Sequence, residues 1–195
     1  MRDKRKRGGR IVLLILLIVC AAGIVWAVQP EVEKQSYPLA YTSQIAQSAE
    51  EYGVDPYLVA AVIRTESGFD TDAVSRVGAR GLMQLMPETG SWIAEKLGMQ
   101  DYTDDALFDP TVNVQFGCWY LRFLQDRFGD STNLIAAAYN AGHNRVRKWL
   151  SDESIAPSGN LTNVPYEETD EYIRRVISAE ETYRRLYPDA FTGRV

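Results

Sequence analysis

The stretch DPYLVAAVIRTES, residues 55–67, indicates which kind of fold the chain adopts. Asp55 followed by Pro56 is a typical helix opening, because an aspartate side chain caps free backbone N–H groups and proline needs no donor in the first turn. Residues 58–63 are apolar almost all round, so this helix should lie at the centre of a core. The segment therefore predicts a buried central helix that ends on a single acid, Glu66.

The rest of the chain outward from this helix is helical in pattern nearly throughout. No stretch alternates between apolar and polar residues for long enough to be a strand. We therefore expect a compact all-α domain of six to eight helices, long enough to bury a core. The expected helices, besides the central one, cover residues 43–53 with a cap at Ser43, 88–98, 109–129, 131–142 and 169–188. A solvated face of the last helix should carry its arginines, Arg174, Arg175, Arg184 and Arg185.

The N-terminal part differs in composition from the rest of the chain. Residues 1–10 carry six Lys or Arg and one Asp, and residues 11–28 carry no charge. A bilayer core needs roughly 20 apolar residues, so 11–28 is predicted to be a transmembrane anchor, with the basic tail in the cytoplasm and the remainder outside. A spacer, 29–42, would then lead to a domain at 43–190. A cleaved signal peptide is the alternative, although its apolar region usually runs about 7–15 residues.

Charge and cysteine content exclude several classes of function. Past residue 10 the chain holds 15 basic and 25 acidic residues, which argues against nucleic acid as a partner. Cys118 is alone outside the predicted anchor and is interpreted as a buried core thiol. There is no Cys or His cluster at metal-ligand spacing, and we expect neither a metal nor a cofactor. The only histidine, His143, is interpreted as a cap or surface residue without a catalytic role.

Glu66 is a candidate proton donor because of its position. The C-terminal end of a helix is negative, so it disfavours a carboxylate and raises the pKa of the acid. Burial against apolar neighbours raises the pKa further. A general acid needs its pKa lifted from about 4.3 to about 6. A lone glutamate that ends a helix is nevertheless more often a surface residue, so this position alone does not decide the matter.

The segment GARGLMQLMP, which begins at Gly78, strengthens the case for a binding site. Gly78 and Gly81 leave room for another molecule to come close. Gln84 offers both a donor and an acceptor, as sugar hydroxyls require, and Met83 and Met86 can adapt to a sugar face. The alternative is a short core helix with incidental methionines, which explains the two leucines but not Gln84.

A second segment, AAAYNAG, places Tyr139 and Asn140 directly after three alanines that permit close helix packing. Tyrosine combines an aromatic body with a hydroxyl, and asparagine adds an amide. Both are therefore candidates for contacting a polar ligand.

Together these segments carry a family resemblance. ESGFDTDAVSRVGARGLMQLMPETG, DPTVNVQFGCWYLRFL, AAAYNAG and PYEETDEYIRRV follow one another in this order. They are similar to the successive motifs of SLT-type lytic transglycosylases, which belong to the goose-lysozyme-like superfamily, over residues 43 to 187. The resemblance implies a compact, goose-type lysozyme-like helical domain. It also implies peptidoglycan as the substrate, cleaved at the β-1,4 bond between N-acetylmuramic acid and N-acetylglucosamine.

In that family one glutamate, matching Glu66, performs both proton transfers. It first protonates the glycosidic oxygen. The resulting carboxylate then takes the proton of the sugar's own C6 hydroxyl, which closes a 1,6-anhydro ring without water. Ordinary glycosidases use two carboxylates, with substrate-assisted exceptions. Here the acetamido group of the substrate is expected to support the developing positive charge.

The resemblance also implies which residues bind the sugar. Ser75 would support the acetamido or lactyl side, and Tyr139 would form a hydrogen bond near Glu66. Relatives often have Glu-Thr-Arg where this chain has Glu-Thr-Asp, ending at Asp170, so a contact with peptide stems or with a muramyl carboxylate is in doubt. The full set of expected substrate-binding residues is Ser75, Gln84, Met86, Tyr139, Asn140, Glu168 and Tyr172.

Two other functions compete with the transglycosylase interpretation. A hydrolytic lysozyme-like muramidase would need a positioned water and a second acid, for which Asp70 and Asp72 are the candidates. A non-catalytic wall-binding module would have no need of an acid such as Glu66. We expect peptidoglycan glycan strands as the partner, met by a domain held outside the cell membrane.

Overall fold

The computed structural model describes residues 18–20, 22–23, 26 and 28–192. The chain divides into two units, Met1–Pro38 and Leu39–Val195, which are described separately. In the first unit, residues 28–36 are helical, whereas the sequence predicted a spacer over 29–42. The predicted anchor at 11–28 lies largely outside the described residues. No helix of the described part is long and apolar enough to cross a membrane.

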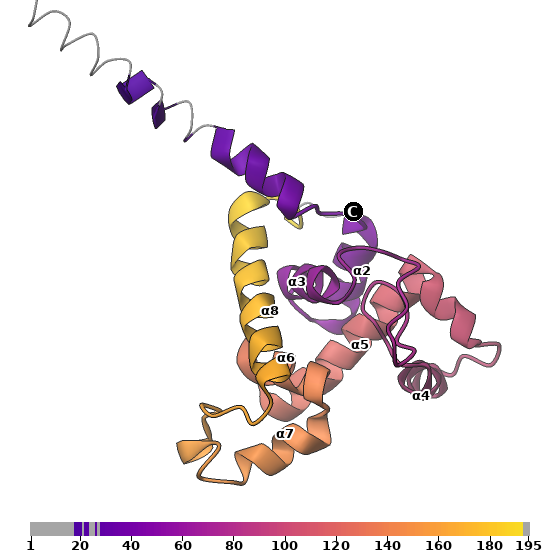
Figure 1. The fold of residues 1–195 in the computed structure, drawn as a ribbon. Coiled ribbons are helices and arrows are strands. Elements are labelled where there is room, and N and C mark those ends of the chain that lie inside the picture. Colours follow the sequence, from indigo (N-terminus) through magenta and orange to yellow (C-terminus); the bar gives the residue numbers. More distant parts are fainter. Residues whose placement is uncertain (1–17, 21, 24–25, 27, 193–195) are drawn as a thin grey trace, which may run out of the picture. The chain divides into compact units, whose positions relative to one another are not determined.

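The described residues of the second unit form an all-α domain, as predicted (Figure 1). Extended pairing among them is limited to isolated bridges between Val74 and Arg80 and between Arg80 and Leu85. The elements are α2 (Thr42–Tyr52), α3 (Pro56–Glu66), α4 (Pro87–Leu97), η1 (Asp104–Phe108), α5 (Pro110–Phe128), α6 (Thr132–Ala141), α7 (His143–Leu150), η2 (Pro157–Gly159) and α8 (Glu167–Leu186), the two η elements being 3-10 helices.

Helix α3 is the central element that the sequence predicted. All its residues from Tyr57 to Ile63 are buried. It packs against α2 and α8, and α8 also packs along α6 (Figure 1). On the other side of the domain α5 packs on α2 and α6, with Cys118 fully buried as expected. This packing fixes the C-terminal end of α3, where Glu66 lies, beside the N-terminal half of α8.

The helix ends that were predicted correctly are set by side chains and glycines close to them in the sequence. The carboxylate of Asp55 accepts a hydrogen bond from the Tyr57 N–H at 2.9 Å, and that of Asp109 accepts one from the Thr111 N–H at 2.7 Å. Both aspartates therefore cap a helix that begins at the next residue, a proline. Gly53 takes the left-handed conformation that ends α2, with φ of 64°.

Two helix starts and one whole helix differ from the predictions. Ser43 does not cap α2, which begins one residue earlier, after Tyr41 in a left-handed conformation. Helix α8 begins at Glu167 rather than Thr169, because the preceding Tyr166 is the last extended residue. Helix α7 was not predicted. Only Val146 and Trp149 of its eight residues are buried, too few apolar positions to show a helical period.

Candidate active site

Glu66 is the last residue of α3 and is held by α8. The hydroxyl of Tyr172, a buried residue of α8, donates to Glu66 Oε1 at 2.7 Å. Burial raises the pKa of Glu66 to about 7, while the Tyr172 hydrogen bond and the charge of Arg175 act in the opposite direction. The raised pKa predicted from the sequence is thus found, with burial as its main cause. The carboxyl group is largely protonated in mildly acidic solution, and so can donate a proton.

The chain after Glu66 folds back onto the core through backbone groups of the 78–87 segment. The hydroxyl of Ser67 donates to the Leu82 carbonyl at 2.7 Å. Met83 is fully buried, and its sulfur lies so close to α5 that a Cβ added at Gly117 would be only 2.0 Å away. The expectation that Met83 faces a sugar is therefore wrong. The segment consists of turns, so the alternative of a short core helix is wrong as well.

The two glycines of this segment have different surroundings. A Cβ added at Gly81 would lie 2.2 Å from the Leu107 carbonyl oxygen. The space beside Gly81 is therefore filled by the protein's own backbone, and the expectation that Gly81 leaves room for another molecule is wrong. A Cβ added at Gly78 would meet no atom within 4 Å. Only Gly78 borders open space.

Asn113 of α5 anchors the segment, and the sequence did not single it out. Its side chain is fully buried and donates to the carbonyls of Arg80 at 3.0 Å and Leu107 at 2.7 Å. Its Oδ1 accepts from the Met83 N–H at 2.8 Å. The available signal was a polar residue on the face of α5 that also carries the buried Phe116 and Gly117.

Some polar groups of the residues expected to bind the sugar in this region already form hydrogen bonds within the protein. Gln84, left-handed with φ of 46°, donates through Nε2 to the carbonyls of Ala73 and Gly81, both at 3.0 Å. Its amide oxygen is thus the group that can meet a ligand. The Ser75 hydroxyl accepts from the Ala79 N–H at 3.0 Å and closes the turn before the segment. Met86 is half-buried and extended, immediately before Pro87.

Tyr139 and Asn140 lie at the end of α6, where they meet other parts of the site. The Tyr139 hydroxyl donates to the Met83 carbonyl at 2.8 Å. Burial, together with the neighbouring Glu66 carboxylate, raises the pKa of Tyr139 well above 10. Asn140 is exposed, and its Oδ1 accepts from the hydroxyl of the buried Thr169 at 2.8 Å. Asn140 thereby ties the end of α6 to the start of α8.

The structure thus brings together Glu66, Tyr139 and Tyr172, three of the predicted site residues, from α3, α6 and α8. Glu168 is exposed in the first turn of α8, and no contact joins it to Glu66 in the described part of the chain. Asp170, where relatives often carry arginine, forms an ion pair with Arg174.

No second acid supports Glu66 among the residues that the structure describes. Asp70 and Asp72 are both exposed, and Asp70 accepts from the Asp72 N–H at 3.0 Å within their loop. The charged group that influences the pKa of Glu66 is a cation, Arg175. Within the described ranges, no group of three or more His, Cys, Asp or Glu residues could hold a metal ion. The geometry is that of a single carboxyl with an adjacent tyrosine donor.

The chain is similar to several known proteins. The family model of the Transglycosylase SLT domain matches residues 43–160. The chain is 31% identical over 159 residues to the soluble lytic murein transglycosylase of Escherichia coli (strain K12), covering 80% of this chain and 25% of that protein. It is 30% identical over 168 residues to the membrane-bound lytic murein transglycosylase C of Shigella sonnei (strain Ss046), covering 74% of this chain and 46% of that protein.

A solved structure is similar as well. It is the lytic transglycosylase Slt from Pseudomonas aeruginosa, in an inactive glutamate-to-glutamine mutant. It shares 35% identity with a TM-score of 0.70 over 76% of this chain and 24% of that one. The chain spans about a quarter of the length of the soluble relatives it matches. With the family model covering more than half of its residues, the chain belongs to the Transglycosylase SLT domain family.

Proposed function

We propose that this chain is a peptidoglycan lytic transglycosylase that cleaves the β-1,4 bond between N-acetylmuramic acid and N-acetylglucosamine without water. Glu66 protonates the bridging oxygen, which leaves with N-acetylglucosamine. The Glu66 carboxylate then accepts the proton of the muramic C6 hydroxyl, whose oxygen bonds to C1 and closes the 1,6-anhydro ring. The acid is restored at the end, and the atoms balance with no co-reactant.

The observation that carries this proposal is a single acid, Glu66, whose pKa is raised to about 7 mainly by burial. A group that must donate and later accept the same proton works best with a pKa near the working pH. Two-carboxylate hydrolysis needs a second acid at a defined separation. Among the described residues, the group bonded to Glu66 is instead the Tyr172 hydroxyl.

We assign the neighbouring residues to the sugar that bears the reacting bond. Tyr172 positions the carboxyl, and Tyr139 holds the Met83 carbonyl. The free amide oxygen of Gln84 and the thioether of Met86 contact the ring. Ser75, Asn140 and Glu168 would meet acetamido, lactyl or peptide groups.

Product analysis tests the proposal. Purified peptidoglycan is digested with the wild-type chain, and the fragments are separated and weighed. Anhydromuramic ends, one water lighter than lysozyme products, are expected. Glu66→Gln should release no fragments while its circular dichroism stays helical. Reducing muramic ends would instead show a hydrolase, and unchanged release by the variant would remove Glu66 from its role.

We also propose that the domain acts outside the cell membrane, tethered through residues 11–28. The charge pattern of residues 1–28 supports this, and one relative is itself named membrane-bound. Fractionation of the full chain followed by alkaline extraction tests it. A tether keeps the protein in the membrane pellet, and a cleaved signal releases a shortened, soluble form.

A further inference from the structure

Met83 connects helix α5 to the surroundings of Glu66. Its N–H donates to Asn113 Oδ1 at 2.8 Å, and its fully buried side chain lies against Gly117 of the same helix. Its carbonyl accepts from the Tyr139 hydroxyl at 2.8 Å. The charge of Glu66 acts on Tyr139, so the two side chains are close. A displacement of Met83 on α5 would therefore reach Tyr139.

The amide group of Asn113 holds three backbone groups at once. Its side chain has no exposed surface, and Nδ2 uses both of its N–H groups, on the carbonyls of Arg80 at 3.0 Å and Leu107 at 2.7 Å. Its oxygen takes the Met83 N–H. An apolar side chain of the same size would leave all three groups without this partner, which is costly inside a protein.

The fit between Asn113 and the chain that it holds is close. A Cβ added at Gly81 would lie 2.5 Å from Asn113 Nδ2, and 2.2 Å from the Leu107 carbonyl oxygen. Gly81 also has a φ of 71°, which side chains rarely adopt. The backbone of residues 80–83 thus rests directly on the Asn113 amide, and the two must move together.

Gln84 depends on the same backbone. It follows Met83 with a φ of 46°, a left-handed conformation that is unfavourable for a residue with a side chain. Such a conformation persists only where its surroundings enforce it. The Gln84 N–H donates to the Gly81 carbonyl at 3.2 Å, and the Leu85 N–H donates to the Arg80 carbonyl at 3.1 Å, the same carbonyl that Asn113 binds. Asn113 therefore helps to fix the turn that directs Gln84.

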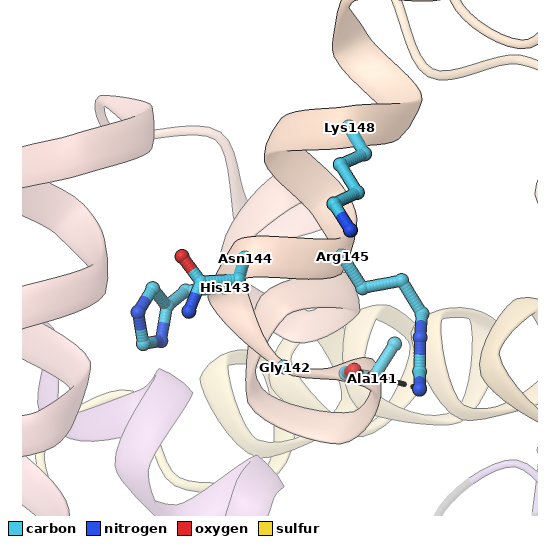
Figure 2. A pocket seen from close by; sticks show the side chains of 6 residues that line it. All are labelled: Ala141, Gly142, His143, Asn144, Arg145 and Lys148. Carbon is cyan, nitrogen blue, oxygen red and sulfur yellow. Dashed lines mark hydrogen bonds between the residues drawn. The ribbon is translucent and has the colours of Figure 1, made fainter.

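The end of α6 that carries Tyr139 borders open space. A cavity of about 330 Å³ lies at the α6–α7 junction, lined in part by Ala141, Gly142 and Arg145 (Figure 2). Arg145 donates to the Ala141 carbonyl at 3.0 Å, as Figure 2 shows. Packing on this side of the helix end is incomplete, so the hydrogen bond to Met83 is an important restraint on the Tyr139 hydroxyl.

We infer that Asn113 is a positioning residue for the reaction, acting through the backbone of residues 80–84. It holds the Met83 carbonyl where Tyr139 binds it, and it holds the turn that directs the amide oxygen of Gln84 toward the sugar. No hydrogen bond joins Asn113 to Glu66 in the described part of the chain, so its effect is transmitted by this segment. The inference rests on the proposed function, in which Glu66 and Gln84 meet the same sugar.

Two variants of nearly the same size test the role. Asn113→Leu neither donates nor accepts, and kcat/KM on purified peptidoglycan strands should fall about a hundredfold at every pH, as expected for misplaced site residues. Asn113→Asp keeps the shape. Burial favours its protonated form, which can donate to one carbonyl and accept the Met83 N–H. At pH 5 this variant should retain most of the wild-type kcat/KM measured at the same pH, and it should lose activity as its carboxyl ionises.

Two controls separate positioning from general damage. Asp109→Ala removes the cap of α5 and weakens the same helix, and Arg145→Gln removes a side-chain bond to a carbonyl two residues from Tyr139. Both should keep the wild-type kcat and KM. Wild-type kinetics in Asn113→Leu, an equal loss in Asp109→Ala, or an Asn113→Asp variant no more active at pH 5 than Asn113→Leu would each overturn the inference.

Two measurements without cleavage separate this inference from the proposed activity. Hydrogen exchange of the Met83 amide, followed by NMR in the absence of substrate, should be fast in Asn113→Leu and slow in the wild type and both controls. In a Glu66→Gln background, Asn113→Leu should bind the strands about tenfold more weakly, comparable to the loss of one hydrogen bond. These results would support the positioning role even if the wild type cleaved no strand. A protected Met83 amide and unchanged binding in Asn113→Leu would refute it and leave the proposed activity standing.

Discussion

The pair of helices α3 and α8 holds a carboxyl group at each of its two ends, in contrasting surroundings. At the N-terminal end of α3, Asp55 meets Arg184 of α8, and at the C-terminal end Glu66 meets Tyr172 of α8. The two helices therefore run antiparallel. The same packing produces a carboxylate held by a cation at one end and a carboxyl held by a hydroxyl at the other.

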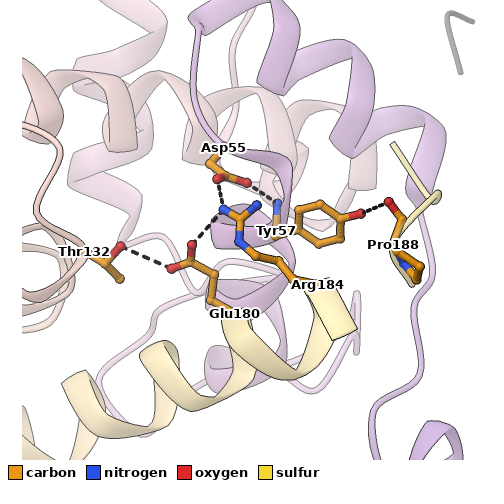
Figure 3. Close-up of polar contacts among 6 residues, drawn as sticks. All are labelled: Asp55, Tyr57, Thr132, Glu180, Arg184 and Pro188. Atoms are coloured by element: carbon orange, nitrogen blue, oxygen red, sulfur yellow. Dashed lines mark hydrogen bonds and ion pairs between the residues drawn. The ribbon is translucent and has the colours of Figure 1, made fainter. Parts of the chain in front are cut away.

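The Asp55 end is a network of charges at the surface (Figure 3). Asp55 accepts from the Tyr57 N–H and pairs with Arg184, which also bonds Glu180 at 2.9 Å. Glu180 in turn accepts from the hydroxyl of Thr132 at 3.1 Å. The side chains of Asp55 and Arg184 remain 38% and 46% exposed, so water screens the pair and its net contribution to stability is small.

The Glu66 end differs in both burial and partner. Burial raises the pKa of Glu66, and the Tyr172 hydroxyl offsets this only in part. A cation in direct contact would lower the pKa of the Glu66 carboxyl and favour its ionised form. An acid that must carry a proton near neutral pH therefore needs a neutral donor at this position. Four changes can break or sharpen the contrast between the two ends.

The largest effect is expected from Glu66→Gln on stability. Below pH 4.5 the carboxyl is protonated in both states and the variant should match the wild type. Between pH 4.5 and about 7 the unfolded carboxyl ionises while the folded one stays neutral, which favours unfolding. Above pH 7 the penalty is complete at roughly 3 kcal/mol, at about 1.4 kcal/mol per pKa unit. Urea unfolding at pH 4 and pH 8 should show the variant as more stable only at pH 8.

Asp55→Ala should lower stability, whereas Glu66→Gln raises it, and should leave the pH dependence of activity unchanged. Losing a helix cap costs about 1 kcal/mol, and the exposed ion pair adds little. The variant should unfold at lower urea concentration while its cleavage of peptidoglycan keeps the wild-type dependence on pH. Asp109→Ala removes a cap of the same kind without an ion pair. A much larger loss for Asp55 than for Asp109 would show that the ion pair is a main support of the domain.

Tyr172→Phe removes the donor at the Glu66 end. That hydrogen bond lowers the pKa of Glu66, so its loss should raise the pKa above about 7 and move the alkaline fall of activity to higher pH. Stability should drop by about 1 kcal/mol, the usual net value of one hydrogen bond. Tyr139→Phe is the comparison, because its hydroxyl bonds the Met83 carbonyl rather than Glu66. If the alkaline limb of Tyr172→Phe coincided with that of the wild type, Tyr172 would have no electrostatic role.

The features that the sequence predicted correctly are those fixed by neighbouring residues. Asp55 and Asp109 cap their helices through groups two residues away, and the apolar run before Glu66 is enough to place that acid at the end of a buried helix. Gly53 and Gly98 end helices because they readily take a left-handed conformation. Such features need no knowledge of the fold.

The features that the sequence missed depend on distant contacts. Met83 faces the core because α5 supplies Gly117 opposite it, and Gly81 is close to η1 rather than to a ligand. Asn113 is understandable only once the carbonyls of Arg80 and Leu107 lie around it. The link between Glu66 and Tyr172 spans 106 residues, and the family resemblance suggested Tyr172 where residue chemistry alone did not.

The smallest effect is expected from Arg175→Gln. This variant sharpens the contrast because Arg175 is the cation whose charge acts on the pKa of Glu66. Its charge lowers the pKa of Glu66 from an exposed position, so salt should weaken its effect. In the wild type, added salt should move the alkaline limb of activity slightly to higher pH. The variant should begin at that higher limb and show no further movement with salt.

Arg174→Gln is the control, since Arg174 pairs with Asp170 and does not act on Glu66. If both variants kept the wild-type salt dependence, Arg175 would have no measurable effect on the pKa of Glu66. Burial and the Tyr172 hydrogen bond alone would then set that pKa, and the contrast between the two ends would come from the lack of a cation in direct contact with Glu66.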